Sequence, residues 1–246
     1  MTKTLILIPS RIAATRLPGK PLLKINNISI ISHVFKRAEE ANIGEVVVAT
    51  DDQEILKDVQ KNGGKAILTS KDHKTGTDRI YEAYKKLNIK DVDYILNLQG
   101  DEPDINKNDI INLNNFMINQ NTELGTLAAK IEDNRMLNNR NVVKVITDKK
   151  LEKNNFPKAL NFTRENLLKN NQNIYHHIGI YAYKVSALET FINLDQTNSE
   201  KKNKLEQLRA LDNKLNINVA LAKSSPIGVD TEEDYLAIKK IMEYKI

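Results

Sequence analysis

The chain has 246 residues, of which 40% are hydrophobic, and its 37 basic and 32 acidic side chains leave a net charge of +5. It contains no cysteine, which excludes disulfide bonds, thiolate metal sites and a cysteine nucleophile. No apolar run approaches the roughly 18 residues of a membrane span and the N-terminus lacks a signal-peptide pattern, so we expect a soluble cytoplasmic protein with a substantial core.

Apolar runs alternate with helical patterns over the first half of the chain. The expected strands are residues 5–8, 45–50, 65–69 and 93–98, and three expected helices are 30–41, 77–87 and 106–119. A further helix is expected to begin with Asp51 or Asp52 as its cap and to end at the two glycines 63–64. Because strands alternate with helices, we predict an α/β fold with a mostly parallel, Rossmann-like sheet flanked by helices.

The pattern is less regular after residue 124. The expected strands there are 124–130, 142–147, 174–184 and 217–222, the expected helices are 186–194, 205–211 and 231–244, and the polar stretch 151–173 has no assignment. No linker rich in Pro, Gly or Ser divides the chain, so we predict a single domain over residues 1–246. The middle of the chain is expected to be a subdomain or a dimer arm.

A cationic loop follows the first expected strand. It carries Arg11, Arg16 and Lys20, and prolines with a glycine at positions 18–21 exclude one continuous helix. Such a loop lies at the carboxyl end of a strand, where open α/β sheets bind ligands. Three fixed cations suit a polyanion such as a triphosphate, although a solvated basic loop is the alternative. The loop resembles the R-x(4)-R-L-P-G-K-P loop of sugar nucleotidyltransferases, which implies nucleoside triphosphate binding.

Two acidic residues stand at other expected loop edges. Asp101 follows a strand in the sequence LQGDEP, and Asp230 precedes the last helix in GVDTEED. An acid beside cations either pairs with them or binds a metal, and Mg²⁺ is commonly held by one or two carboxylates together with substrate phosphates. The alternatives are a turn at Asp101 and a helix cap at Asp230, with Glu233 completing a capping box.

The segment 72–79, DHKTGTDR, lies between a strand and a helix. Gly76 gives access to the backbone and Thr77 can cap the helix, so the segment can close over a base or a ribose. The alternative is an ordinary capped turn, and His73 by itself reads as a surface histidine.

Eight segments in order along the chain resemble one family, the 3-deoxy-manno-octulosonate (Kdo) cytidylyltransferases. They read IPSRIAATRLPGKPL, VVVATDD, DHKTGTDR, LQGDEP, NVVKV, HHIGIYAY, LEQLR and GVDTEEDY. The resemblance implies a fold of the nucleotide-diphospho-sugar transferase type, with residues 131–185 forming an antiparallel sugar-side and dimer subregion. It further implies CTP and Kdo as substrates, Mg²⁺ as cofactor, a homodimer, and a place in lipopolysaccharide synthesis.

The resemblance also implies a reaction, in which the anomeric hydroxyl of Kdo attacks the α-phosphorus of CTP and pyrophosphate leaves. Asp101 and Asp230 would hold Mg²⁺, and Lys20 would neutralise charge on the α-phosphate. The other residues implied to bind the nucleotide are Arg11, Arg16, Gly76, Thr77, Arg79 and Gln99. The residues implied to bind the sugar are Gln99, Arg164, His177, Tyr181, Glu206 and Gln207. From the residues alone, His177 and Tyr181 read as half-buried strand positions, and Glu206 and Gln207 as a solvated helix face.

The chain departs from the family pattern at one segment. Where the family has FSR-x-x-IP-aromatic-x-R, this chain reads NFTRENLLKNN, which keeps Arg164 and lacks the second arginine. The departure leaves a related acid sugar, such as amino-Kdo, as an alternative substrate. Two functions of other classes stay open on the residues alone: a sugar-nucleotide-dependent glycosyltransferase and a non-enzymatic nucleotide- or nucleic-acid-binding protein.

Overall fold

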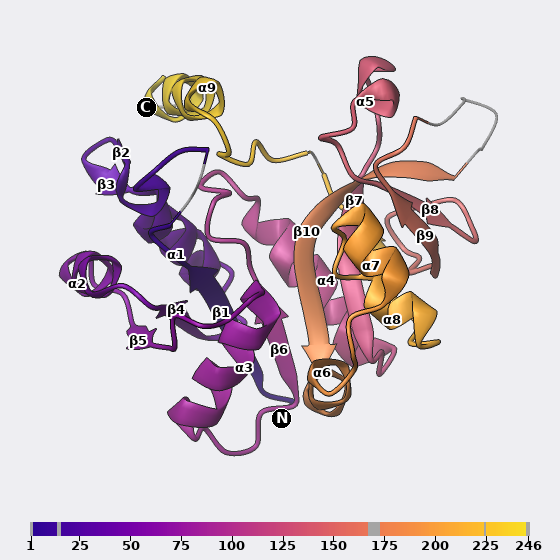
Figure 1. The fold of residues 1–246 in the computed structure, drawn as a ribbon, viewed down its shortest axis with the longest axis horizontal. Coiled ribbons are helices and arrows are strands. Elements are labelled where there is room, and N and C mark those ends of the chain that lie inside the picture. Colours follow the sequence, from indigo (N-terminus) through magenta and orange to yellow (C-terminus); the bar gives the residue numbers. More distant parts are fainter. Residues whose placement is uncertain (1, 14–15, 167–172, 224, 245–246) are drawn as a thin grey trace. The chain divides into compact units, whose positions relative to one another are not determined.

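The computed structural model describes residues 2–13, 16–166, 173–223 and 225–244 (Figure 1). The chain forms two compact units, of which the first comprises Met1–Ile110 with Pro226–Ile246 and the second Ile111–Ser225. The expected subregion 131–185 falls inside the second unit. None of the helices in the described residues combines the length and the apolar character that crossing a bilayer requires.

A parallel four-stranded sheet forms the centre of the first unit. Strand β1 (Thr4–Ser10) lies between β4 (Gly44–Thr50) and β6 (Tyr94–Asn97), and β5 (Ala66–Leu68) pairs with β4. The side chains of residues 5–8 are at most 1% exposed, as expected for a central strand buried on both faces. The prediction of parallel strands alternating with helices is confirmed for this unit.

Helices connect and flank these strands. They are α1 (Ile30–Glu40), α2 (Gln53–Lys61), α3 (Gly76–Leu87) and the C-terminal α9 (Glu232–Glu243). A 3₁₀ turn, η1 (Lys20–Leu22), and a short hairpin of β2 (Lys24–Ile25) and β3 (Ile28–Ser29) follow the cationic loop. Ile238 of α9 packs with Ile25 of the hairpin and with Val229 in a buried cluster, which brings the segment before α9 to the cationic loop.

The second unit contains a mixed sheet. Strand β7 (Leu124–Ala129) pairs parallel with β11 (Asn218–Leu221) and antiparallel with β10 (Ile174–Lys184); β8 (Lys144–Thr147) pairs antiparallel with β10 and with β9 (Ala159–Thr163). Its helices are α5 (Arg135–Asn138), α6 (Val185–Ile192), α7 (Asn198–Asn203) and α8 (Leu208–Asp212), and α4 (Lys107–Asn119) leads into it from the first unit. The predicted antiparallel region is therefore confirmed.

Strand β9 lies within the stretch 151–173, where the sequence predicts no element. Its five residues read ALNFT; Leu160 is 61% exposed, and the buried positions do not alternate with exposed ones. The period of two that identifies a half-buried strand is therefore absent.

Candidate functional site

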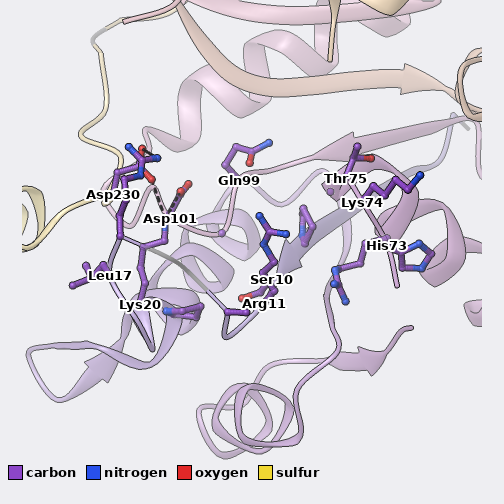
Figure 2. A pocket seen from close by; sticks show the side chains of 17 residues that line it. Ser10, Arg11, Leu17, Lys20, His73, Lys74, Thr75, Gln99, Asp101 and Asp230 are labelled. Carbon is purple, nitrogen blue, oxygen red and sulfur yellow. Dashed lines mark hydrogen bonds and ion pairs between the residues drawn. The ribbon is translucent and has the colours of Figure 1, made fainter. Parts of the chain in front are cut away.

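A pocket of about 310 Å³ opens in the first unit, where β1 and β6 end (Figure 2). Its walls come from segments between Pro9 and Pro21, between His73 and Arg79, and between Gln99 and Asp101, together with Asp230. The sequence predicts Asp101 on the same side of the sheet as the cationic loop, and the structure brings these two together with the segment 73–79 and Asp230.

Lys20 lies at the centre of a charged cluster in this pocket. Its Nζ atom is 2.8 Å from Oδ2 of Asp101 and 3.3 Å from Oδ1 of Asp230, and Nη2 of Arg16 is 3.0 Å from Oδ2 of Asp230 (Figure 2). The Lys20 side chain is only 14% exposed. Gly19 has a φ of 71°, a left-handed conformation that favours glycine, and it starts the 3₁₀ turn that carries Lys20. The cationic loop is thus shaped by its glycine to point one ammonium at two carboxylates.

The turn that carries Asp101 packs closely against the end of β1. A Cβ atom on Gly100 would lie 2.9 Å from the carbonyl oxygen of Pro9, so this approach requires glycine. The carbonyl of Asp101 accepts a hydrogen bond from the Val229 N–H at 2.9 Å. This bond joins the two segments that supply the acids.

Asp230 does not cap the last helix. The N-cap of α9 is Thr231, whose hydroxyl accepts from the Asp234 N–H, and Asp234 completes the capping box in place of Glu233. The Asp234 carboxylate also accepts from the N–H of Asp230 at 3.1 Å. The capping interpretation of Asp230 is therefore wrong, and its carboxylate faces the cations of the pocket.

The donor set fits a magnesium ion. Asp101 and Asp230 both reach the same ammonium, so their oxygens converge on one point that already attracts a positive charge. Among the described residues no group of three His, Asp or Glu side chains could hold a metal by itself. An ion at this point would thus complete its shell from substrate phosphates and water, as Mg²⁺ commonly does.

Arg79 lines the pocket but is anchored by neighbouring groups. Its guanidinium donates to Asp51 Oδ2 at 2.8 Å, Thr69 Oγ1 at 2.6 Å and the Ser70 carbonyl at 3.3 Å, and the residue is 3% exposed. The α3 N-cap is Thr75, not Thr77, which is buried. These contacts make Arg79 a support for the loop, and direct nucleotide contact by Arg79 stays a prediction.

His73 is not a free surface histidine. Its Nε2 contacts the carboxylate of Glu82 on α3, which also accepts from the Ser70 N–H at 2.9 Å. Burial raises the pKa of Glu82, but hydrogen bonds from Lys86, Ser70 and His73 outweigh it and lower that pKa to about 2. Sequence reasoning names neither Glu82 nor Asp51 as a site residue, yet both hold the segment that lines the pocket.

Five of the six residues that the resemblance assigns to the sugar lie in the second unit, whereas Gln99 lines the pocket of the first. The rings of His177 and Tyr181 on β10 have centroids 5.5 Å apart. Burial, together with neighbouring His176 and Arg164, lowers the pKa of His177 to about 3, so its ring is neutral. Burial raises the pKa of Tyr181, whose hydroxyl is buried and makes no hydrogen bond within the described part of the chain.

Glu206 and Gln207 stand directly before α8. Gln207 is 8% exposed, so it does not belong to a solvated helix face. Buried Arg209 makes a bidentate ion pair with Glu200 at 2.9 and 2.6 Å, and its Nη2 is 3.9 Å from Glu206 Oε1. Burial is the main cause of the raised pKa of Tyr181, and the Glu206 carboxylate raises it further, so the two side chains are close enough to interact.

Comparisons with known proteins agree on one family. The family model described as "Cytidylyltransferase" matches residues 5–217. A 3-deoxy-manno-octulosonate cytidylyltransferase of Thermodesulfovibrio yellowstonii is 44% identical over 97% of this chain and 98% of that protein, and one of Rhodopseudomonas palustris (strain BisB18) is 43% identical over 99% of both. A solved structure of CMP:2-keto-3-deoxy-manno-octonic acid synthetase complexed with CTP is 34% identical and covers 100% of both chains with a TM-score of 0.91.

Proposed function

The chain belongs to the family of 3-deoxy-manno-octulosonate (Kdo) cytidylyltransferases, and we propose that the pocket of its first unit is where the reaction takes place. The enzyme transfers CMP from CTP to Kdo, which gives CMP-Kdo and pyrophosphate. One observation carries the assignment of the pocket: Lys20 contacts both Asp101 and Asp230 at the carboxyl edge of the sheet. Family membership decides against the glycosyltransferase and the non-enzymatic alternatives.

The cations of the pocket are proposed to bind the triphosphate. Arg11 and Arg16 line the pocket beside Lys20 and offer planar guanidinium groups to the outer phosphates. Lys20 lies deepest among these charges and would neutralise the charge that grows on the α-phosphate. Its two carboxylate partners hold the ammonium at the pocket floor, and it would turn from them to the phosphate when the metal ion binds the acids.

The acids are proposed to hold Mg²⁺ together with the phosphates. The ion would supply charge neutralisation at the phosphate oxygens and lower the pKa of a bound hydroxyl. Asp101 and Asp230 contribute two negative charges, which offset the surplus of cations in the pocket while no nucleotide is bound.

The segment 73–79 is proposed to border the nucleoside. Gly76 lets the start of α3 approach β1, since a Cβ atom there would lie 3.2 Å from Pro9 Cγ. Arg79 and Glu82 hold the segment from inside the unit. Gly76 and Gln99, which line the pocket, are the residues we expect nearest to the base and the ribose, whereas Thr77 is buried behind them.

The polar side chains of the second unit are proposed to bind the sugar. Neutral His177 and un-ionised Tyr181 supply hydrogen bonds for hydroxyl groups, and Glu206 and Gln207 add acceptors and a donor. Arg164 would pair with the sugar carboxylate. Assembly as a homodimer and a location in the cytoplasm stay predictions from the sequence.

A panel of nucleotides and acid sugars tests this function. Pyrophosphate release should require CTP, an acid sugar and Mg²⁺, and a chelator should stop it. Amino-Kdo belongs in the panel because the chain lacks the second family arginine after Arg164. Release with a neutral sugar in place of the acid sugar would contradict the assignment of Arg164.

A further inference from the structure

Lys144 is a buried cation in the second unit that the reaction described above does not use. It lies on β8, belongs to the segment NVVKV, and is 0% exposed. Its Nζ donates to two neutral acceptors, the carbonyls of Asn139 at 2.9 Å and of Arg164 at 3.4 Å. A buried charge is costly without a partner of opposite charge, and two neutral carbonyls do not compensate the charge of Lys144 in full.

A second cation binds the same short segment. Arg164 directly follows β9, which pairs with β8 (Figure 1). Its Nη1 donates to the carbonyls of Arg140 at 3.3 Å and Asn141 at 3.1 Å. The side chains of Lys144 and Arg164 therefore both bind carbonyls of residues 139–141, and the Lys144 ammonium also binds the Arg164 carbonyl.

The two cations repel each other, and within the described ranges of the chain neither makes an ion pair with a carboxylate. Burial lowers the pKa of Lys144, and the charge of Arg164 lowers it further. Glu165 directly follows Arg164, but it is exposed, and in the described part of the chain its carboxylate makes no ion pair with either cation. Residues 167–172, which come next, read LLKNNQ and contain no acid.

The neighbouring histidines add no charge to this cluster. His176 is the register partner of Lys144 across β10 and β8, and its Nδ1 lies 2.9 Å from Ser225 Oγ. Burial and the charge of Lys144 lower the pKa of His176, while burial, His176 and Arg164 lower that of His177. Both rings are neutral at neutral pH, so the net charge of this cluster is positive.

We propose that Lys144 is a positioning residue of the acid-sugar site: it fixes Arg164 through its backbone carbonyl and, with Arg164, supplies the positive potential that attracts the sugar carboxylate. The inference rests on the proposed sugar binding by the second unit. Because Lys144 is fully buried, it acts on the substrate through Arg164 and through its field, not by contact. A carboxylate bound at Arg164 would relieve the repulsion between the two cations, which favours an acid sugar over a neutral one.

Three variants separate charge from hydrogen bonding. Lys144→Gln keeps a donor for the two carbonyls and removes the charge; Lys144→Arg keeps the charge; Lys149→Gln removes an exposed lysine of the same unit as a control. We expect Lys144→Gln to raise the sugar KM about tenfold, the effect of losing one charge interaction at intermediate dielectric. The CTP KM should change little, Lys144→Arg should restore most of the sugar KM, and Lys149→Gln should change neither value.

The thermal midpoint of each variant is measured with the two KM values. An unchanged sugar KM in a folded Lys144→Gln enzyme overturns the proposal, and so does an equal rise in both KM values, which would mean general damage to the fold. If Lys144→Gln does not unfold cooperatively, Lys144→Met replaces it, because methionine removes the same charge without burying an amide group. An unchanged sugar KM in a folded Lys144→Met enzyme then overturns the proposal. Absence of turnover in the wild-type enzyme would instead contradict the proposed function itself.

Discussion

Lys20 and Asp101 are 81 residues apart in the sequence, yet Nζ of the lysine lies 2.8 Å from Oδ2 of the aspartate. The same ammonium reaches Asp230, 210 residues away, at 3.3 Å. Both acids hold the lysine before any metal or phosphate arrives, and the ammonium would move from them to the phosphate once Mg²⁺ takes its place. Electrostatic stabilisation of this kind is commonly the largest single contribution to catalysis.

The two acids should be essential for turnover but not for folding. Asp101→Asn and Asp230→Asn each remove one anionic oxygen donor from the proposed metal site, so we expect kcat to fall at least about 100-fold with a nearly unchanged thermal midpoint. Asp52→Ala is the matched control. It removes the N-cap of α2, which does not line the pocket, and should lower stability by about 1 kcal/mol while kcat stays close to that of the wild type. Near-normal rates for both asparagine variants at limiting Mg²⁺ would show that neither acid binds the metal during the reaction.

Lys20 should act mainly in the transition state. If it neutralises charge that develops on the α-phosphate, Lys20→Ala lowers kcat by roughly 10²–10³, the scale of one preorganised donor, and raises the CTP KM less. Steady-state kinetics at saturating sugar measure both values. A variant that loses CTP affinity and keeps its kcat would make Lys20 a ground-state anchor for phosphate.

The sequence predicts the first unit better than the second. Strands such as β1 are continuous apolar runs, and the glycines and prolines after them mark loops without knowledge of tertiary structure. Strand β9 escapes prediction because Leu160 is exposed and the alternation is lost. Tertiary packing therefore determines strand β9 of the second unit, whose own residues do not predict it.

The same distinction holds for the candidate site. Lys20 and Asp101 are expected to meet, because they follow parallel strands whose carboxyl ends lie at one edge of the sheet, and they do so. Asp230 precedes α9, so this rule does not predict that it reaches the same ammonium. Support residues are not predictable in this way. The Asp51–Arg79 pair depends on the tertiary approach of two segments 28 residues apart, and no local pattern identifies it.

Glu82 should contribute stability that acid removes. Its pKa is about 2 in the folded protein against an ordinary value of 4.5, so its hydrogen bonds stabilise the fold above about pH 4.5 and this contribution is lost as the pH falls toward 2. Urea unfolding should therefore show Glu82→Gln less stable than the wild type at about pH 6, with a smaller difference at about pH 3. Glu39→Gln on the exposed face of α1 is the control. An equal difference at both pH values would show that ionisation of Glu82 is irrelevant.

Arg164 should decide affinity for the sugar acid. A bidentate arginine has the best geometry for a carboxylate, and this chain keeps only one of the two family arginines. Arg164→Ala should raise the sugar KM at least about tenfold with a nearly unchanged CTP KM, and Arg164→Lys should rescue it in part, because an ammonium cannot make the fork contact.

Two lysines serve as comparisons for Arg164. Lys158 is exposed in the second unit, and Lys169 lies outside the described residues. Alanine at either position should leave the sugar KM unchanged. If Lys169→Ala raises it and Arg164→Ala does not, the carboxylate is bound by the lysine instead.

The fate of the α-phosphate tests the central claim most directly. CTP labelled at the α-phosphorus is incubated with Kdo, Mg²⁺ and the purified enzyme, and the products are separated and identified by mass. The label should appear in CMP-Kdo in step with the release of unlabelled pyrophosphate, and Asp101→Asn should abolish both. Label recovered only in unreacted CTP, or in free CMP without a sugar nucleotide, would contradict cytidylyl transfer by this pocket.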